Sequence, residues 1–285
     1  MEKISLVIPC FNERSAIEQT IDEISFLVGK ALHEIIIVDD GSFDGTYEIL
    51  KNRKDIKLVR NPYNKGYGYS LKKGIMASTG EIIAICDADG TYPIESILLM
   101  VKKLEEGYDM VIGKRDNLKS FDPFIKKVSR FFFKQIAQFV AGEKILDVNS
   151  GLRVFRRDVM KRYLPNTSSG FSFSLSTTLI FILEGLSVYY YPIEYRPRVG
   201  KSKVRYLRDI LRSAQILVET ITLYNPIKIF MLISAMISLL GFIALFTSFG
   251  LFGFVILQGI SLYTFSLGLI AFLLKKRILN DKYDA

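Results

Sequence analysis

Two aspartates separated by one residue stand directly behind an apolar run, because Asp87-Ala88-Asp89 follows the letters EIIAIC. In an extended chain, residues i and i+2 point to the same side, so both carboxylates can face one point. Such a pair suits a hard divalent cation, Mg²⁺ or Mn²⁺, which would also ligate a diphosphate. A D-x-D pattern on its own is more often a solvated turn. Other motifs in the sequence are therefore needed to support a metal site.

A second acidic group ends another Ile-rich run, at Asp39-Asp40-Gly41-Ser42, and Asp44-Gly45-Thr46 follows it. Carboxylates at the end of a strand can accept hydrogen bonds from a ribose or a base. They can equally belong to a capping turn in which Ser42 and Asp44 satisfy helix amides, and both interpretations can hold together. The chain has no G-x-G-x-x-G and no G-x-x-x-x-G-K-[ST], so neither a dinucleotide oxidoreductase nor a P-loop NTPase is indicated.

These acidic groups lie in a stretch where short apolar runs alternate with helix-like segments. Such alternation predicts an α/β domain with a mostly parallel sheet and helices on both faces. The predicted strands are Ile4–Pro9, Glu34–Asp39, Ile56–Val59, Glu81–Cys86 and Met110–Gly113, and the helices Ser15–Val28, Gly45–Asn52, Gly66–Ala77 and Ile94–Glu105. Further along we expect a helix from Asp122 to about Gly142, a strand at Leu152–Phe155, a helix at Ser172–Glu184 and a strand at Ser187–Tyr191.

The last quarter of the chain indicates a membrane. From Ile229 to Leu274 there is no Asp, Glu, Lys, Arg or His, which is long enough for two crossings with a turn near Gly250 and Gly253. Basic residues flank both ends of this run, so the positive-inside rule places both ends, and the preceding domain, on the cytosolic side. The N-terminus has no signal-peptide pattern.

The predicted organisation has five parts. They are a cytosolic domain over residues 1–202, an amphipathic helix over 203–224, transmembrane helices over 226–249 and 252–274, and a cytosolic tail over 275–285. The amphipathic helix is as compatible with the membrane interface as with ordinary packing on a surface.

The net charge of +9 could indicate nucleic acid, an anionic membrane surface or a phosphorylated substrate as the partner. Basic residues precede the apolar run, which favours lipid headgroups or a lipid phosphate over nucleic acid. A second basic cluster, interleaved with Phe131–Phe133, includes Lys126 and Arg130 and is expected to capture lipid phosphate or touch the membrane. No nucleic-acid partner is predicted, and the oligomeric state is not indicated.

Taken in order, the motifs resemble those of family 2 inverting glycosyltransferases, which have the GT-A (Rossmann-like) fold. The resemblance is strongest to the polyprenyl-phosphate branch, which includes the dolichyl-phosphate mannose synthases, and it covers about residues 1–205. The motifs are VIPCFNE at 7–13, IVDDGSFDGT at 37–46, NKGYGYSLKKG at 64–74, CDADG at 86–90, IGKR at 112–115, DVNSGLRVFRR at 147–157 and PIEYRPRVGKSK at 192–203.

The resemblance implies a set of residues for each part of the site. The nucleotide pocket would be lined by Pro9, Phe11, Glu13, Val38, Asp39 and Asp40, with Asp87, Ala88 and Asp89 holding the nucleotide and the metal-bound diphosphate. Asp87 and Asp89 would ligate the metal. Phosphate and acceptor contacts would come from Arg115, Lys126, Arg130, Ser150, Arg153, Arg198, Lys201 and Lys203. Thr91 stands where the mannose synthases carry Gln, so neither its place in the metal shell nor GDP-mannose as donor is implied.

Three functions follow as hypotheses. The preferred one is transfer of a sugar from a UDP- or GDP-sugar to polyprenyl phosphate, with Asp89, Asp147 and Arg115 as catalytic residues. A phosphate monoester is largely dianionic at neutral pH and needs no strong general base. Transfer to a hydroxyl of a lipid or a lipid-linked glycan would need a base, and Asp147 could be that base or a structural residue. The third is a non-catalytic membrane protein that binds nucleotide sugars.

Overall fold

The computed structural model describes residues 2–117, 134–139, 141–197 and 206–283. It divides into two compact units, Met1–Ile216 and Leu217–Ala285.

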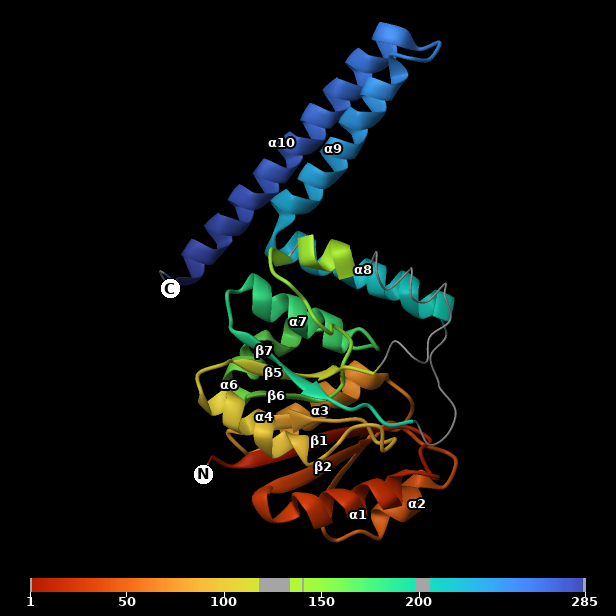
Figure 1. Cartoon of the computed structure of the whole chain (residues 1–285), viewed down its shortest axis with the longest axis vertical. Coiled ribbons are helices and arrows are strands. Elements are labelled where there is room, and N and C mark those ends of the chain that lie inside the picture. The colour runs from red at the N-terminus through yellow and green to blue at the C-terminus, as the bar shows by residue number, and fades with distance from the viewer. Residues whose placement is uncertain (1, 118–133, 140, 198–205, 284–285) are drawn as a thin grey trace. The chain divides into compact units, whose positions relative to one another are not determined.

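A seven-stranded sheet forms the centre of the first unit (Figure 1). Its order is β3-β2-β1-β4-β6-β5-β7, and every neighbouring pair is parallel except those of β6, which runs antiparallel to both β4 and β5. The strands are β1 Ile4–Cys10, β2 Glu34–Asp39, β3 Lys57–Arg60, β4 Ile82–Ile85, β5 Met110–Arg115, β6 Arg153–Arg156 and β7 Val188–Ile193. The predicted mostly parallel sheet is therefore confirmed.

The strands carry apolar side chains on both faces, which explains why helices pack on both faces of the sheet. In β1, Leu6 and Ile8 face one core and Val7 faces the other, as the two-residue period of a strand requires. The first core is closed by α1 Ile17–Leu27, α2 Thr46–Lys51 and α4 Ser96–Glu105. The second is closed by α3 Tyr67–Ala77, α6 Arg157–Tyr163 and α7 Phe173–Leu183 (Figure 1).

Three short elements were not predicted: α6 and the 3-10 turns Gly29–Ala31 and Leu164–Asn166. The helix α6 follows β6 without any intervening loop, so no turn residue marks its start. Of the helix predicted from Asp122, residues 134–139 are helical, and residues 118–133 and 140 lie outside the described part of the chain.

Two apolar helices dominate the second unit, α9 Pro226–Ala244 and α10 Gly250–Tyr283. Both are long and apolar enough to cross a membrane. The first ends five residues before the predicted limit of 249, and α10 continues past Arg277 without a break. Gly250, which has a φ of +48°, opens α10, whereas Gly253 lies within it.

Polar and small residues join the two apolar helices. The Ser234 hydroxyl lies 2.9 Å from that of Ser261, and the Ser238 hydroxyl donates to Gln258 Oε1 at 2.9 Å. Gly268 leaves room for the Phe230 ring, since a Cβ at this position would come within 2.5 Å of Phe230 Cβ. Small residues and hydrogen-bonding side chains are the means by which helices pack in lipid. The hairpin therefore has an internal seam suited to a bilayer.

Candidate active site

The aspartates of the CDADG motif stand just beyond β4, at its carboxyl end, where α/β sheets bind ligands. Asp89 is only 4% exposed. Its Oδ1 accepts hydrogen bonds from the Thr91 backbone N–H at 3.2 Å and from the Thr91 hydroxyl at 2.6 Å. This short turn, with Gly90 at a φ of +69°, fixes the direction of the Asp89 carboxylate.

The Asp87 carboxylate is confined between a tyrosine and a glycine. The Tyr67 hydroxyl donates to Asp87 Oδ1 at 2.9 Å. On the other side lies Gly151, where an added Cβ would come within 2.8 Å of Oδ1 and 2.9 Å of Oδ2. Burial raises the pKa of Tyr67 well above its usual value and the Asp87 charge raises it further, so this phenol stays a proton donor.

The Tyr195 side chain lies near the aspartates and near Arg115. The pKa of Tyr195 is raised, first by burial and then by Asp89 and Asp87, while Arg115 acts in the opposite direction. The Tyr195 ring also meets the ring of Tyr92 edge-on at 5.2 Å. The Arg115 guanidinium lies 5.4 Å from the centre of the Tyr195 ring. Because β4 and β5 are both antiparallel to β6, the strand ends next to Asp87, Asp89 and Arg115 lie at the same edge of the sheet.

Arg115 and Asp147 form an ion pair beside these tyrosines. Arg115 lies at the end of β5, and its side chain and that of Asp147 are 13% and 12% exposed. Burial alone would raise the pKa of Asp147, but hydrogen bonds and charge from Arg115 outweigh this and hold it below its usual value. Both Asp147 oxygens face the guanidinium, which favours the structural role over the role of a base.

Two predicted phosphate contacts, Ser150 and Arg153, are fully buried. The Arg153 guanidinium donates to the carbonyls of Val148 and Ser150 and to the Thr178 hydroxyl. Burial lowers its pKa to about 10, which leaves it charged at neutral pH. The interior position corrects the prediction for Arg153, because its guanidinium holds the loop before β6 instead of facing a ligand. Within the described residues, the Ser150 hydroxyl has no hydrogen-bond partner.

The predicted nucleotide residues lie at the neighbouring ends of β1 and β2, where Pro9 pairs with Val38. The Val38 side chain is in the core beneath α3, so it is the backbone of this residue that can border a pocket. Phe11 meets Phe43 edge-on at 5.9 Å. The Glu13 backbone N–H donates to the Thr46 hydroxyl at 3.0 Å, which ties the loop after β1 to α2.

The two aspartates of the DDGS motif differ in their contacts. Asp39 is fully buried, and its Oδ1 accepts the Ser42 N–H. Of the two expected capping residues, Asp44 accepts the N–H of Thr46, the first residue of α2, at 3.0 Å, whereas the Ser42 hydroxyl accepts the Asn12 N–H instead of a helix amide. The Asp40 carboxylate accepts three bonds, from Asn61 Nδ2 at 2.7 Å and from the backbone N–H groups of Lys65 and Gly66 at 2.9 and 2.8 Å. Asp40 therefore holds the loop that leads into α3.

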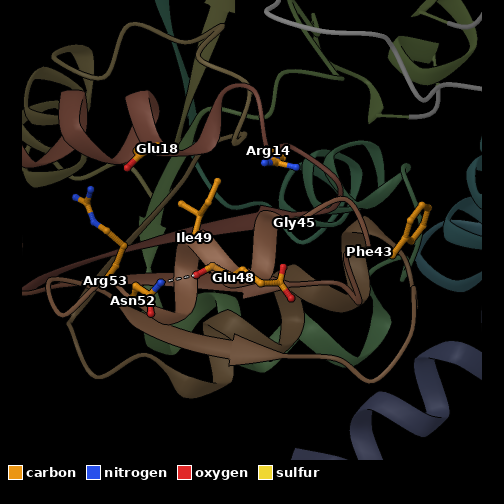
Figure 2. A pocket seen from close by; sticks show the side chains of 8 residues that line it. All are labelled: Arg14, Glu18, Phe43, Gly45, Glu48, Ile49, Asn52 and Arg53. Carbon is orange, nitrogen blue, oxygen red and sulfur yellow. Dashed lines mark hydrogen bonds between the residues drawn. The ribbon is translucent and has the colours of Figure 1, made fainter.

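A pocket of about 810 Å³ lies between α1 and α2 (Figure 2). Its lining residues are Arg14, Glu18, Phe43, Gly45, Glu48, Ile49, Asn52 and Arg53. None of the predicted donor, metal or acceptor residues is among them, and Arg53 is already paired with Asp22 and Asp55. The two aspartates after β4 are therefore the better candidate for the site.

The donor set at this edge fits a hard cation in part. In the described ranges, no three His, Cys, Asp or Glu side chains gather around one point. Asp87 and Asp89 supply oxygens of the kind that Mg²⁺ and Mn²⁺ prefer. A cation held by two carboxylates would complete its shell with water and with oxygens of a bound diphosphate. The residues thus fit a metal that arrives with its substrate.

Some predicted site residues lie outside the described part of the chain, and some residues near the aspartates were not predicted from the sequence. Lys126, Arg130, Arg198, Lys201 and Lys203 are outside the described residues. Tyr67, Tyr92 and Tyr195 were not predicted as site residues, although two of them are inside the quoted motifs. Tyr67 stands between two glycines and Tyr92 precedes a proline, patterns that are also common in turns, whereas Tyr195 has no such neighbour in the sequence.

The chain is similar in sequence to known proteins. Residues 5–164, more than half of the chain, match the profile described as Glycosyl transferase family 2. An undecaprenyl-phosphate 4-deoxy-4-formamido-L-arabinose transferase of Yersinia pestis is 29% identical over 85% of this chain and 74% of its own. A dolichyl-phosphate hexose transferase of Haloferax volcanii is 27% identical over 71% of this chain and 87% of its own.

A solved structure shares the fold. Glucosyl-3-phosphoglycerate synthase from Mycobacterium tuberculosis, in complex with Mn²⁺, UDP and phosphoglyceric acid, superposes with a TM-score of 0.64. The two chains are 21% identical, and the match covers 77% of this chain and 78% of the synthase. The architecture is therefore of the GT-A type, as the sequence motifs predicted.

Proposed function

The chain belongs to glycosyl transferase family 2 and is a glycosyltransferase, and from this premise we propose that it transfers a sugar from a UDP- or GDP-sugar to polyprenyl or dolichyl phosphate. The observation that carries the proposal is that Asp87 and Asp89 follow β4 at the same edge of the sheet where Arg115, at the end of β5, pairs with Asp147 before β6. The names of the two transferase relatives, which specify undecaprenyl phosphate and dolichyl phosphate, support the acceptor.

The donor would lie across the ends of β1, β2 and β4. Phe11 would offer a ring near the base. Asp39 is fully buried, with its carboxylate on the Ser42 N–H and 3.3 Å from Arg60 Nε, so it would support this end of β2 without touching the nucleotide. Asp87 and Asp89 would hold Mg²⁺ or Mn²⁺ together with the diphosphate. When bound, the cation neutralises charge that develops on the departing diphosphate. Mn²⁺ or Mg²⁺ with UDP in the synthase structures supports this choice of metals.

The acceptor phosphate would attack without a protein base. One oxygen of the dianionic phosphate forms a bond to the anomeric carbon, on the face opposite the diphosphate. The bond from that carbon to the donor oxygen breaks, and its electron pair leaves with the nucleoside diphosphate. Attack from the opposite face inverts the anomeric configuration. The protein contributes by holding two anions together, with its cationic side chains offsetting their repulsion.

Transfer to a hydroxyl is the weaker alternative because it needs a general base. Among the residues singled out from the sequence, Asp147 is the candidate for that role. Its two oxygens accept hydrogen bonds from Arg115 and from the Asn149 backbone N–H. A carboxylate that is so engaged, with its pKa lowered, accepts a proton poorly at neutral pH.

The reaction would take place at the cytosolic face of a membrane crossed by α9 and α10, with both chain ends in the cytosol. Lys228 and the Lys275–Arg277 cluster at the two ends of the hairpin support this orientation. Two reporters fused to residue 285 test this orientation: green fluorescent protein, which fluoresces in the cytosol, and alkaline phosphatase, which is active only on the other side of the membrane. The first fusion is expected to fluoresce. Activity of the second would contradict the proposed topology.

The central experiment uses the full chain in detergent micelles with a panel of radiolabelled UDP- and GDP-sugars. Label is expected in lipid when polyprenyl phosphate and Mn²⁺ are present, and it should disappear in Asp89→Ala. Lipid-linked glycan offered in place of polyprenyl phosphate is the competing acceptor. Product formed with that glycan and not with polyprenyl phosphate would contradict the proposal.

A further inference from the structure

The Tyr67 hydroxyl is in direct contact with one of the two proposed metal ligands. It donates to Asp87 Oδ1 at 2.9 Å, and it reaches this carboxylate from α3, a different element from the strand that carries Asp87. A hydrogen bond on one carboxylate oxygen fixes the rotation of the whole group. The remaining lone pairs then point in a defined direction before any ligand arrives.

The Tyr67 ring is itself held in place. It lies parallel to the ring of Phe171, with an angle of 2° between the planes and 5.9 Å between the ring centres. Phe171 belongs to the loop before α7, and it is 49% exposed. The ring of Tyr67 therefore has a partner on one face and a carboxylate at its hydroxyl.

The backbone around Tyr67 is fixed by a close approach between two loops. The Tyr69 N–H donates to the Ser169 carbonyl at 2.9 Å. At Gly68, an added Cβ would come within 2.3 Å of the Ser168 carbonyl oxygen, so a larger residue cannot occupy this position without displacing the loop. Asp40 also accepts the N–H of Gly66, immediately before Tyr67.

Asp87 has little freedom on its other side. The Gly151 Cα is so close that a methyl group there would touch both carboxylate oxygens. Gly151 in turn donates its N–H to the Tyr92 hydroxyl at 2.7 Å, which fixes the glycine. The Asp87 carboxylate thus contacts the Tyr67 hydroxyl and the Gly151 Cα, and hydrogen bonds hold the segments to which both residues belong.

We propose that Tyr67 is a positioning residue that orients Asp87 for the divalent cation and diphosphate of the donor. The inference rests on the proposed function and deepens it, because it assigns a supporting role to a residue outside the aspartate motif. Loss of a hydrogen bond that orients a metal ligand typically weakens metal binding by about 10- to 100-fold. Tyr67→Phe should show this effect while keeping the ring and its stacking.

The test measures Mn²⁺ binding to the full chain in detergent micelles, in the presence of UDP or GDP, by the electron paramagnetic resonance signal of free Mn²⁺. We expect Tyr67→Phe to bind Mn²⁺ about 10- to 100-fold more weakly than the wild type. Tyr69→Phe is the matched control, since its hydroxyl lies on the same helix and contacts Lys65 Nζ at 3.3 Å. Its Mn²⁺ affinity should stay within about twofold of wild type.

Equal Mn²⁺ affinities for Tyr67→Phe and wild type would overturn the positioning role. Thermal unfolding without metal verifies that Tyr67→Phe folds. If it does not fold, Phe171→Leu, which removes the stacking partner and keeps the hydroxyl, should weaken Mn²⁺ binding, and an unchanged affinity would contradict the proposal. Absence of Mn²⁺ binding by the wild type with either nucleotide would instead overturn the proposed metal dependence, and the role of Tyr67 with it.

Discussion

Arg115 and Asp147 are joined by two parallel hydrogen bonds, from Nε to Oδ2 at 2.8 Å and from Nη2 to Oδ1 at 2.9 Å. The pair connects the end of β5 with the loop that precedes β6. Planar geometry of this kind is the strongest form of an ion pair, and it explains how the loop carrying Ser150 and Gly151 keeps its place beside the aspartates.

Asp147→Ala should leave the buried Arg115 guanidinium without its carboxylate partner and lower the free energy of unfolding by about 3–5 kcal/mol. Arg115→Ala should cost a similar amount, and the double variant should cost clearly less than the sum. Unfolding of the full chain in detergent measures all three. Strictly additive losses would mean that the two side chains do not act on each other.

The same pair predicts a loss of stability in acid. The pKa of Asp147 is lower in the folded chain than its unfolded value of about 3.9, so its contribution is present above that pH and lost as pH falls through the folded pKa. The unfolding temperature of the wild type should therefore fall more steeply below about pH 4 than that of Asp147→Asn. Parallel curves for the two proteins would contradict this.

Gly151→Ala should disturb Asp87 directly, because the added methyl group would lie 2.8 Å from Asp87 Oδ1. Displacement of a reacting group by about 1 Å can cost about 100-fold in rate, so a loss of that order in sugar transfer is expected. Gly29→Ala is the control, since its Cβ would meet no atom closer than 3.7 Å. Equal activity of both variants would show that Asp87 tolerates the contact.

Two glycines of α10 differ in their surroundings: one packs against α9 and the other has no neighbour. A side chain at Gly268 would collide with Phe230, whereas nothing lies within 4 Å of a Cβ at Gly259. Gly268→Leu should destabilise the hairpin by about 1–3 kcal/mol, and Gly259→Leu should have little effect. The unfolding temperature in lipid nanodiscs compares them, and a similar loss for both would contradict the packing of the two helices.

Much of the fold could be predicted from local pattern. The strand β2 has its predicted bounds, because four consecutive apolar residues, Ile35–Val38, are followed by two aspartates and a glycine. The helices α3 and α4 begin within two residues of the predicted positions. In each case a turn residue or a change of hydrophobic period marks the boundary.

The direction of β6 could not be predicted, since the apolar alternation of a four-residue strand is the same in both directions. Its antiparallel pairing depends on where the chain before it travels. The role of Arg153 was hidden for a similar reason: a charged residue in a motif suggested a ligand, and only the fold reveals that carbonyl oxygens surround it.

Contacts across the site were also invisible to sequence patterns. Tyr67 and Asp87 are twenty positions apart, and Arg115 and Asp147 thirty-two. The chemistry of each side chain could be anticipated, but a partner at such a separation is defined by the packing of α3 on the sheet and by the path of the loop before β6.

The antiparallel contact between β4 and β6 has an evolutionary consequence. It divides the sheet into one uninterrupted N-terminal stretch through β4 and a second part made of β6, β5 and β7. Asp87 and Asp89 follow the first part, whereas Gly151, which touches Asp87, comes from the second. Recombination at this joint would therefore replace the neighbours of the aspartates together with the rest of the later segment, so the two parts are constrained to evolve together.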